Sequence, residues 1–336
     1  MIRFLLRRML LTIPVFIGLT LLVFAISRVL PGDPVQLAAG PQASAQEIEH
    51  LRAELGLDRS LPQQYASYLK GLVKGDFGES VLSRRPVAED LKLFLPATLE
   101  LVFAAMAMAI GLGIPLGLIA AVYRDRWPDY ALRVVSLSSI SMPRFFLGLL
   151  LQLGFAMWLG WLPLSGRYPL TAEPVETVTG FLLIDCLING QFSEYFIAVQ
   201  HLLLPAFAMC LSPLATLIRM MRASVLDVLQ QDYILTARAL GLSRQKILLK
   251  YVLKNSLSAS LTVIGLYFGW LLGGTVLVET IFDWPGIGLY ATKAIVSQDF
   301  QPVMAVTLCI GVMFVVVNTL IDSLYGFLNP KVSHND

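Results

Sequence analysis

Six long apolar stretches, separated by polar segments, set the pattern of hydrophobic and polar positions along this chain. A helix needs about 20 apolar residues to cross a hydrocarbon core about 30 Å thick, because lipid offers no hydrogen bonds to an exposed backbone. We therefore predict an all-α protein with six transmembrane helices, which places both ends of the chain on one side of the membrane. The predicted spans are residues 9–30, 97–122, 134–160, 202–221, 259–282 and 302–327.

The distribution of Lys and Arg indicates which side holds the two ends, since basic residues are retained on the cytoplasmic face. Basic residues precede the first span and follow the second, and the loop 222–255 after the fourth span carries the largest group. We therefore expect both termini and this loop to be cytoplasmic. The basic residues that carry this argument are Arg3, Arg7, Arg8, Arg124, Arg126, Arg133, Arg219, Arg222, Arg238, Arg244, Lys246, Lys250, Lys254 and Lys331.

The first outer segment, residues 31–96, is long enough to fold. Ser44 with Glu47, and Ser60 with Gln63, form two capping boxes, and each is followed by apolar residues at helical spacing. We expect two short amphipathic helices from this pattern. They either cover the helix bundle or help to dock an external partner.

A second outer segment, residues 161–200, contains an apolar run at 178–188. This run is too short to span the bilayer as a helix. We expect it to form a re-entrant or surface-lying element at the outer mouth, or else a docking surface for a soluble protein.

The cytoplasmic loop has the pattern of a helix, a turn and a second helix. Asp232 opens a run with apolar residues at helical spacing, Gly241 ends it, and Ser243 can cap the helix that follows. Ala237 and Gly241 are four residues apart, so we expect them on one face, where small side chains let another surface approach the backbone. An ordinary helix hairpin is the alternative interpretation.

Glycines recur at four-residue spacing inside two predicted spans. Gly265, Gly269 and Gly273 lie in the fifth span, and Gly113 and Gly117 lie in the second. Small residues at this spacing let two helices pack closely in a membrane. We expect them to serve helix packing, with a role in lining a pathway through the protein as the alternative.

Arg144 follows Pro143 inside the third predicted span. An Arg at the centre of a membrane helix costs about 2.5 to 3.5 kcal/mol, so its side chain should face a cavity or a protein partner instead of lipid. We take Arg144 as a candidate pathway residue. The alternative is a shallower position beside a polar neighbour.

Composition excludes several classes of protein. Apolar residues make up 56% of the chain and charged residues 14%, whereas about 25% charged is usual for soluble domains. The net charge of +2 provides no basic field for nucleic acid. Three Cys and three His are scattered, and neither a phosphate-binding P-loop nor a catalytic constellation occurs. We expect an integral membrane protein that is not an enzyme and holds no cofactor or metal.

The run from Asp232 to Ser243 resembles the coupling loop of ABC-importer permeases, in the form used by the dipeptide and oligopeptide branch. Other short motifs look like that branch in the same order, so the resemblance covers nearly the whole chain. They are Arg7-Arg8, Pro31-Gly32-Asp33-Pro34, Gly75-Asp76-Phe77-Gly78, Pro96-Ala97-Thr98-Leu99-Glu100, Gly160-Trp161-Leu162-Pro163, Phe282-Asp283-Trp284-Pro285-Gly286-Ile287-Gly288 and Asn329-Pro330.

This resemblance implies a type I ABC-importer permease fold in the bacterial inner membrane. Residues 1–95 would form the first span and a helical periplasmic region, residues 96–328 the transmembrane core, and residues 329–336 a short cytoplasmic tail. The implied partners are a second homologous permease, two cytosolic ATPase subunits that bind the ATP, and a periplasmic peptide-binding protein. The implied substrates are dipeptides or short oligopeptides, and the branch includes permeases for glutathione and D-alanyl-D-alanine-type dipeptides.

The resemblance also assigns roles within the loop. Ala237 and Gly241 would give close contact with an ATPase subunit, Tyr233 and Arg238 would flank that contact, and Asp232 would start the helix. The chain departs from the wider family in three places. Thr236 replaces a Glu, Leu240 replaces a Lys, and no Pro occurs between Pro213 and Pro285.

An ion-coupled secondary transporter, acting without an ATPase, is the alternative function. Such transporters usually show internal repeats and carboxylates near the middle of the membrane. The sequence has no visible repeat and no Asp or Glu at the centre of a predicted span. These observations favour the importer permease.

Overall fold

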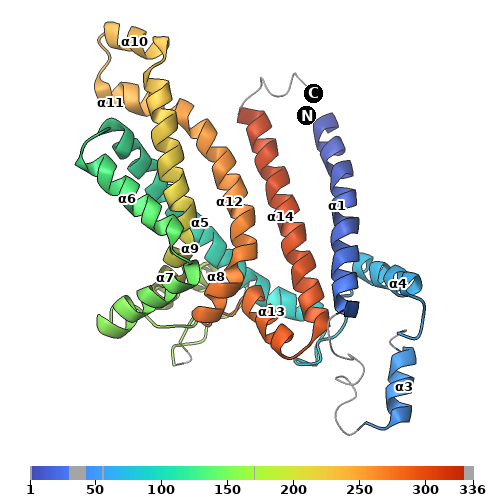
Figure 1. The fold of residues 1–336 in the computed structure, drawn as a ribbon. Coiled ribbons are helices and arrows are strands. Elements are labelled where there is room, and N and C mark those ends of the chain that lie inside the picture. The colour runs from blue at the N-terminus through green and yellow to red at the C-terminus, as the bar shows by residue number, and fades with distance from the viewer. Residues whose placement is uncertain (1, 30–42, 55–56, 170, 329–336) are drawn as a thin grey trace. The chain divides into compact units, whose positions relative to one another are not determined.

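The computed structural model describes residues 2–29, 43–54, 57–169 and 171–328 of the chain (Figure 1). Within this part the regular elements are helices, and the β pairing is one isolated bridge between Glu79 and Pro86. The predicted all-α class is confirmed. The motifs at 31–34 and 329–330 lie outside the described residues.

Within the described residues, four helices are long and apolar enough to cross a membrane. Helix α1 (Ile2–Val29) contains a shorter apolar segment, Thr12–Ile26. These helices match five of the six predicted spans in position, while the count of six remains a prediction. The four are α5 (Val87–Val122), α9 (Phe192–Leu229), the Val263–Ile281 part of α12 (Lys254–Ile281) and the Phe300–Ile321 part of α14 (Phe300–Leu328).

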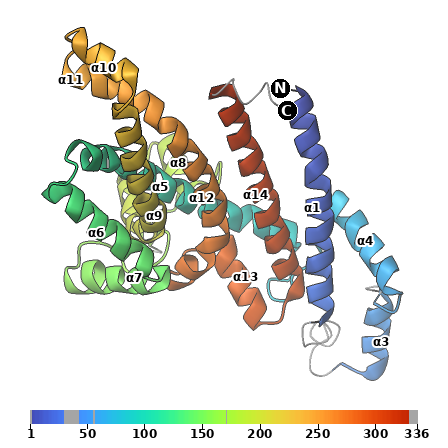
Figure 2. The same cartoon turned by 45° about the horizontal axis from the view of Figure 1, so that its top comes forward.

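The prediction of one continuous helix over residues 134–160 is wrong. Helix α6 (Trp127–Ser141) ends within this range. Helix α7 (Arg144–Leu151) follows and runs on into the π-helix η1 (Gln152–Trp158), and this second helical segment is bent by 109° from α6 (Figure 2). Pro143 explains the break, because its ring disfavours helical backbone in the preceding residue. Met142 accordingly adopts an extended conformation, with φ −89° and ψ 129°.

The chain divides into two compact units. The first contains Leu99–Trp284 and the chain from Phe314 onward, and the second contains Ile2–Thr98 and Pro285–Met313. The N-terminal boundary at residues 98 and 99 lies near the boundary expected at 95 and 96. The domain assignment made from the sequence does not include the grouping of Pro285–Met313 with the N-terminal part.

Close helix contacts at glycines hold the first unit together. A Cβ at Gly113 would lie 2.8 Å from the Cβ of Leu217, and a Cβ at Gly117 would lie 2.5 Å from the Cβ of Met221. Helices α5 and α9 therefore touch along the predicted small-residue stripe, which confirms its packing role. Helices α9 and α12 run side by side in both views (Figures 1 and 2).

The glycine stripe of α12 is used in part. A Cβ at Gly265 would lie 2.5 Å from Ile321, and one at Gly269 would lie 2.6 Å from the ring of Phe314, so both glycines admit α14. Around Gly273, no atom of the described residues lies within 4 Å of such a Cβ. Two of the three glycines thus serve packing as predicted.

A buried carboxylate organises the segment between η1 and α9 in the first unit. Glu100, at 6% exposure, accepts hydrogen bonds from Arg167 Nε at 2.9 Å and from the backbone N–H of Leu183 at 2.8 Å. The apolar run at 178–188 forms only the short helix α8 (Leu182–Ile188). This helix is too short to span a bilayer, which agrees with the prediction from the length of the apolar run.

Both predicted capping boxes are present in the second unit. The carboxylate of Glu47 accepts from the backbone N–H of Ser44 at 2.7 Å, which lowers the pKa of Glu47, and α3 (Ala45–Glu54) follows. Ser60 and Gln63 likewise begin α4 (Leu61–Val73). The Tyr65 hydroxyl of α4 lies 2.9 Å from Oγ1 of Thr20 on α1. For α4 this contact supports the covering role.

Two further buried carboxylates tie α13 (Ile287–Val296) into the second unit. Asp90 accepts from the Tyr290 hydroxyl at 2.8 Å, and Asp299 accepts from the Ser80 hydroxyl at 2.7 Å. Gly78, in the Gly75–Gly78 motif, has φ +81°, and a Cβ there would lie 2.9 Å from the Gln301 side chain. The backbone conformation therefore favours glycine here, whereas the flexible end of Gln301 could move away from an added side chain.

Candidate functional site

The loop 222–255 forms a helical hairpin, as predicted. Helix α10 (Asp232–Ala239) has the carboxylate of Asp232 in its first turn, where it favours the positive end of the helix dipole. Gly241 follows with φ +72°, and its N–H donates to the carbonyl of Arg238 at 2.9 Å. A glycine with positive φ is a common way to end a helix. The Ser243 side chain then caps the next helix by accepting from the N–H of Lys246.

The second arm of the hairpin joins the fifth predicted span without a break. Helix α11 (Arg244–Lys246) continues through the π-helix η2 (Ile247–Leu253) into α12. The predicted span 259–282 is therefore one part of a longer helical segment that begins at Arg244. Short π-helical segments are rare and often lie at functional sites.

An apolar cluster anchors α10 on the rest of the first unit. Ile234 is fully buried, and Ala237 is 5% exposed. Their neighbours come from the ends of α5 and α9 and from η2. The buried members of the cluster are Ala121, Met221, Val225, Ile234, Ala237, Ile247 and Val252.

The expectation that Ala237 and Gly241 share one helical face is wrong. Ala237 packs inside the chain, and Gly241 lies in the turn beyond the end of α10 at Ala239. The four-residue rule holds only within a continuous helix. Around Gly241, no described atom lies within 4 Å of where a Cβ would stand, so this position is open to a partner.

The remaining predicted loop residues face outward. Asp232 and Arg238 are exposed, and Tyr233 is 42% exposed while its hydroxyl accepts from Nδ2 of Asn255 at 3.2 Å. Leu235 and Leu240 are also exposed, at 55% and 73%. Neither leucine is among the loop residues predicted to contact a partner. The sequence does carry a signal for them, because large apolar residues that lie together on a polar surface can mark a protein contact.

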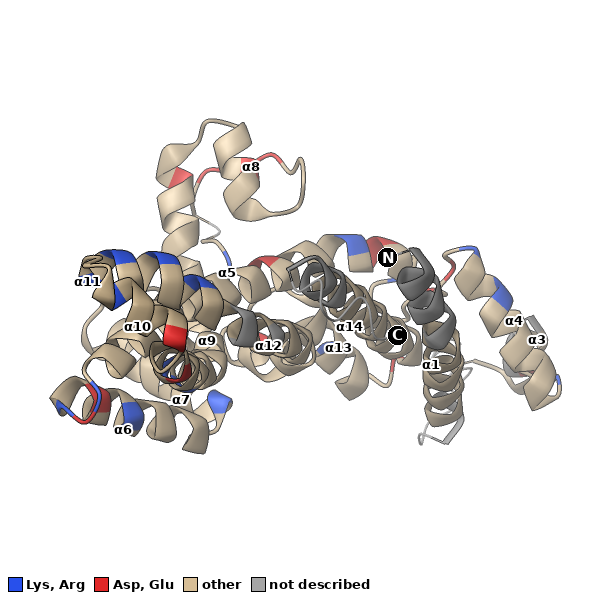
Figure 3. Cartoon of the chain, turned by 90° about the horizontal axis from the view of Figure 1, so that it is seen from above, with Lys and Arg blue, Asp and Glu red and all other residues tan. Residues whose placement is uncertain are grey.

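Basic residues surround this apolar tip. Figure 3 shows Lys and Arg concentrated on and around α11, with few acidic residues nearby. The exposed basic residues are Arg238, Arg244, Lys246, Lys250 and Lys254. The loop thus presents apolar side chains within a positively charged rim.

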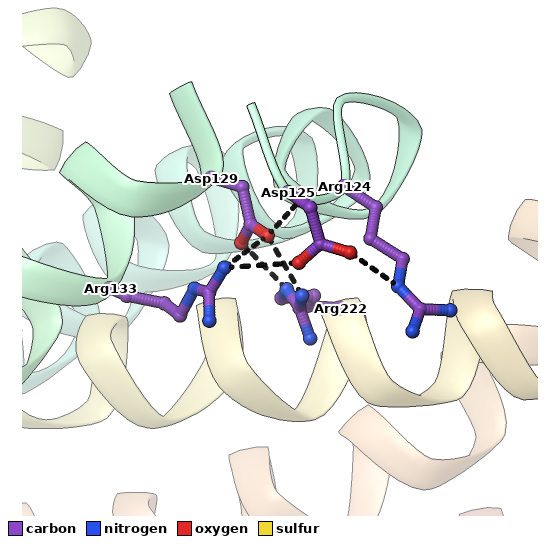
Figure 4. A network of polar contacts seen from close by, with 5 residues as sticks. All are labelled: Arg124, Asp125, Asp129, Arg133 and Arg222. Atoms are coloured by element: carbon purple, nitrogen blue, oxygen red, sulfur yellow. Dashed lines mark hydrogen bonds and ion pairs between the residues drawn. The ribbon is translucent and has the colours of Figure 1, made fainter. Parts of the chain in front are cut away.

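A buried carboxylate lies at the base of the loop (Figure 4). Asp129, in the first turn of α6, is fully buried, and its oxygens accept from Nε of Arg222 at 2.7 Å and from Nη2 at 2.8 Å. Arg133 adds a contact of 2.8 Å. The backbone N–H of Asp125, a residue with φ +58°, donates to the same carboxylate at 3.0 Å. Sequence reasoning missed Asp129, because its partner Arg222 is distant in the chain.

Arg144 begins α7 and contacts α12. Its guanidinium lies 4.9 Å from the ring centroid of Trp270, and it fills the space beside Gly274. Its Nη2 is buried and has no hydrogen-bond partner among the described residues. These contacts do not show whether Arg144 lines a pathway. Its role as a pathway residue stays a prediction.

No group of three His, Cys, Asp or Glu side chains in the described residues could hold a metal ion. The loop presents exposed apolar side chains, basic residues and a glycine turn.

Comparison with known families gives the context for this loop. Residues 113–334 match the family described as binding-protein-dependent transport system inner membrane component, and residues 1–102 match the N-terminal region of such membrane components. The chain belongs to this family. The permease is therefore a transport subunit and not an enzyme, and the predicted recognition is confirmed. Permeases of this kind work with ATPase and substrate-binding protein partners.

Curated relatives match the permease from end to end. It is 40% identical to the dipeptide transport system permease protein of Alkalihalophilus pseudofirmus, over 99% of this chain and 100% of the relative. It is 43% identical to the di/tripeptide transport system permease protein of Pseudomonas aeruginosa, over 99% of each chain. It is 37% identical to the glutathione transport system permease protein of Escherichia coli, over 99% of this chain and 100% of the relative.

A solved structure supports the fold. The permease matches a chain of the inward-facing MetNI methionine ABC transporter with a TM-score of 0.52 and 13% identity, covering 69% of this chain and 93% of that one. At this identity the match shows the fold of an ABC transporter permease and does not bear on substrate.

Proposed function

We propose that this permease forms half of the translocation pathway of a bacterial ABC importer for dipeptides or short oligopeptides. The observation that carries the proposal is the end-to-end similarity, at 40% and 43% identity, to permeases named for dipeptide and di/tripeptide transport. Similarity over the whole length includes the regions that face substrate as well as those that face partners. The permease itself binds no nucleotide, so energy comes from its ATPase partners.

The cytoplasmic loop is the proposed contact with an ATPase subunit. Tyr233 and Arg238 present an aromatic and a charged group to the partner, and the exposed Leu240 adds apolar surface. Asp232 stabilises the start of α10, and Gly241 forms the turn that exposes the tip. Ala237 acts from inside, by packing α10 on the helices that must move.

We further propose the finer topology. Six spans, with the bent pair α6 and α7 counted as the third, place both termini in the cytoplasm and segments 31–96 and 161–200 outside. The importer contains two permease subunits, two ATPase subunits and one periplasmic peptide-binding protein. Residues 1–95, 96–328 and 329–336 form the N-terminal region, the transmembrane core and the tail. The basic residues of the loop and of the α5 to α6 turn support this orientation.

The proposed mechanism is alternating access. Closure of the ATPase dimer displaces the loop and changes the relative population of inward-open and outward-open states. Such a shift requires that the ATPases bind the two states with different affinity. Arg144, held against Trp270 without a described counter-ion, is the proposed contact with the pathway.

The test is transport by the complete importer in proteoliposomes. We expect uptake of a labelled dipeptide that requires ATP and the binding protein and is blocked by vanadate. Uptake by this chain alone, driven by an ion gradient, would contradict the proposal and favour a secondary transporter. Omitting the binding protein from the same proteoliposomes is the matched control.

A further inference from the structure

The ion pair between Asp129 and Arg222 connects the base of the coupling loop to helix α6. No residue of α6 belongs to the apolar cluster that anchors α10. Arg222 lies on α9, which runs on to Leu229 just before α10 begins at Asp232. Asp129 lies in the first turn of α6. Helices α6 and α9 pack along each other, and the pair adds a charged contact to this packing at the loop end of α9.

The geometry of the pair is specific. Arg222 donates from two nitrogens to the two oxygens of Asp129, at 2.7 Å and 2.8 Å, and Arg133 occupies a further acceptor position at 2.8 Å. Bidentate contacts between Arg and a carboxylate fix orientation as well as distance. Buried ion pairs often add little net stability, because desolvation offsets the attraction. What the pair provides is a defined position of α6 on α9.

The surroundings make this end of the unit stiff. A Cβ at Gly117 of α5 would lie 2.9 Å from the carbonyl oxygen of Ile218 and 3.4 Å from the amide nitrogen of Arg222, so α5 abuts the α9 backbone at the level of the pair. Ile234 and Ala237 of α10 pack on Met221 and its neighbours. Because α10 packs closely on α9, we expect a displacement of α10 to move α9 with little deformation of the contact between them.

Helix α6 carries that displacement further. It leads through the bend at Pro143 into α7, and α7 packs against both α9 and α12. Arg144, at the start of α7, contacts Trp270 of α12. The path from the loop to α7 that runs through α6 thus includes the charged contact at Asp129, beside the direct packing of α7 on α9 and α12.

We propose that Asp129 and Arg222 are positioning residues for coupled transport, which transmit the displacement of the loop to α6 and α7. This inference rests on the proposed function, because it assumes that an ATPase moves the loop. Neither side chain contacts substrate or ATP. Breaking the pair leaves the ATPase contact in place and weakens its connection to α6 and α7.

The experiment compares Asp129→Asn and Arg222→Gln with Arg124→Gln as the matched control. Arg124 lies in the same turn, but it is exposed and pairs with the exposed Asp125. In the reconstituted importer we would measure dipeptide uptake and ATP hydrolysis together. Coupling free energies commonly correspond to factors of 5 to 150, so we expect the ratio of peptide to ATP to fall about tenfold in the first two variants. The control keeps the wild-type ratio.

A double variant tests whether the two residues act as one unit. If they do, Asp129→Asn combined with Arg222→Gln lowers the ratio no further than either change alone. Arg222→Lys keeps the charge but loses the bidentate geometry, so we expect an intermediate ratio. It also serves as the deciding variant if Asp129→Asn prevents assembly of the complex.

The outcomes separate this inference from the proposed function. An unchanged ratio, or equal losses of uptake and ATP hydrolysis, would overturn the positioning role, since a purely structural role reduces both in parallel. Failure of the wild-type importer to show uptake dependent on ATP and binding protein would overturn the proposed function. Normal wild-type transport with unaltered ratios in the variants would overturn the inference alone.

Discussion

At the scale of single residues, the loop separates positions that shape it from positions that meet a partner. Ala237 is buried and Gly241 is exposed in the turn, although both are small. Gly241 has φ +72°, a conformation that costs most residues about 1 to 2 kcal/mol. Smallness therefore serves packing at one position and backbone conformation at the other.

Gly241→Asp tests the coupling assignment at residue scale. Asp tolerates the left-handed conformation better than most residues, so we expect normal folding and membrane insertion. Its carboxylate would project into the open space where the ATPase is proposed to bind, so uptake should fall while basal ATP hydrolysis persists. Uptake in proteoliposomes and membrane fractionation give the two readouts.

Gly241→Asn is the control for that prediction, because it matches Asp in size and conformational preference without the charge. A smaller loss in this variant assigns the effect to charge at the interface. Unchanged uptake with Gly241→Asp would argue against the coupling role of the loop.

Arg144→Met tests the pathway assignment. Met removes a charge that has a buried, unpaired Nη2 and keeps an unbranched side chain, so thermal stability should be unchanged or slightly higher. If Arg144 serves the pathway, maximal dipeptide uptake should fall by about tenfold, corresponding to about 1.4 kcal/mol in a rate-limiting step. Uptake and the unfolding midpoint would be measured on the same preparation.

Trp270→Phe provides the comparison for Arg144→Met, because it keeps an aromatic face for the guanidinium. We expect it to retain most of the uptake. A lower unfolding midpoint in Arg144→Met, with uptake per folded complex intact, would show a structural role instead.

At the scale of elements, close contact at glycines decides which helices pack directly against each other. Helix α5 meets α9 at Gly113 and Gly117, and α12 meets α14 at Gly265 and Gly269. The regular spacing along the sequence predicts such stripes, but it does not reveal which partner each helix takes. Partner choice depends on residues far away in the chain, such as Met221 for Gly117.

A matched pair of changes on α5 tests this packing. A Cβ at Gly117 would lie 2.5 Å from Met221 and 2.9 Å from a backbone carbonyl, so Gly117→Ala should destabilise the protein by about 1 to 3 kcal/mol. At Gly111, no described atom lies within 4 Å of the added methyl group, so Gly111→Ala should be neutral or slightly stabilising. Thermal unfolding of the detergent-purified protein would measure both changes. Equal effects would contradict the close contact.

At the scale of the whole molecule, the sequence predicts the helices better than their joints. Apolar length and the capping boxes at Ser44 and Ser60 predicted most helices, because both are local signals. The bend at Met142 was missed, since hydropathy averages over Pro143. The contact between Asp129 and Arg222 was missed because spacing rules cover only neighbours within one helix. Burial of Ala237 likewise depends on partners from other helices.

Cysteine labelling tests the proposed topology of the molecule. In a background with Cys186, Cys210 and Cys309 replaced by Ser, single cysteines at Arg84 and Arg244 occupy exposed positions in the outer segment and the loop. We expect an impermeant maleimide to label Arg84→Cys in cells whose outer membrane is permeable to the reagent and whose inner membrane is sealed. Arg244→Cys should be labelled only after that membrane is permeabilised. The reverse pattern would contradict the cytoplasmic assignment of the loop.

The π-helix at Ile247–Leu253 adds chain between the coupling loop and α12 without a break in the helix. Its hydrogen bonds span five residues instead of four, so it holds more chain per turn than an α-helix. Such a wide turn takes up an extra residue while the helix on either side keeps nearly the same rotational phase. Deleting one residue and letting the segment become α-helical would therefore leave Gly265 and Gly269 facing Ile321 and Phe314. The side of α12 that meets α14 thus depends on this wide turn as well as on the number of residues in the hairpin's second arm.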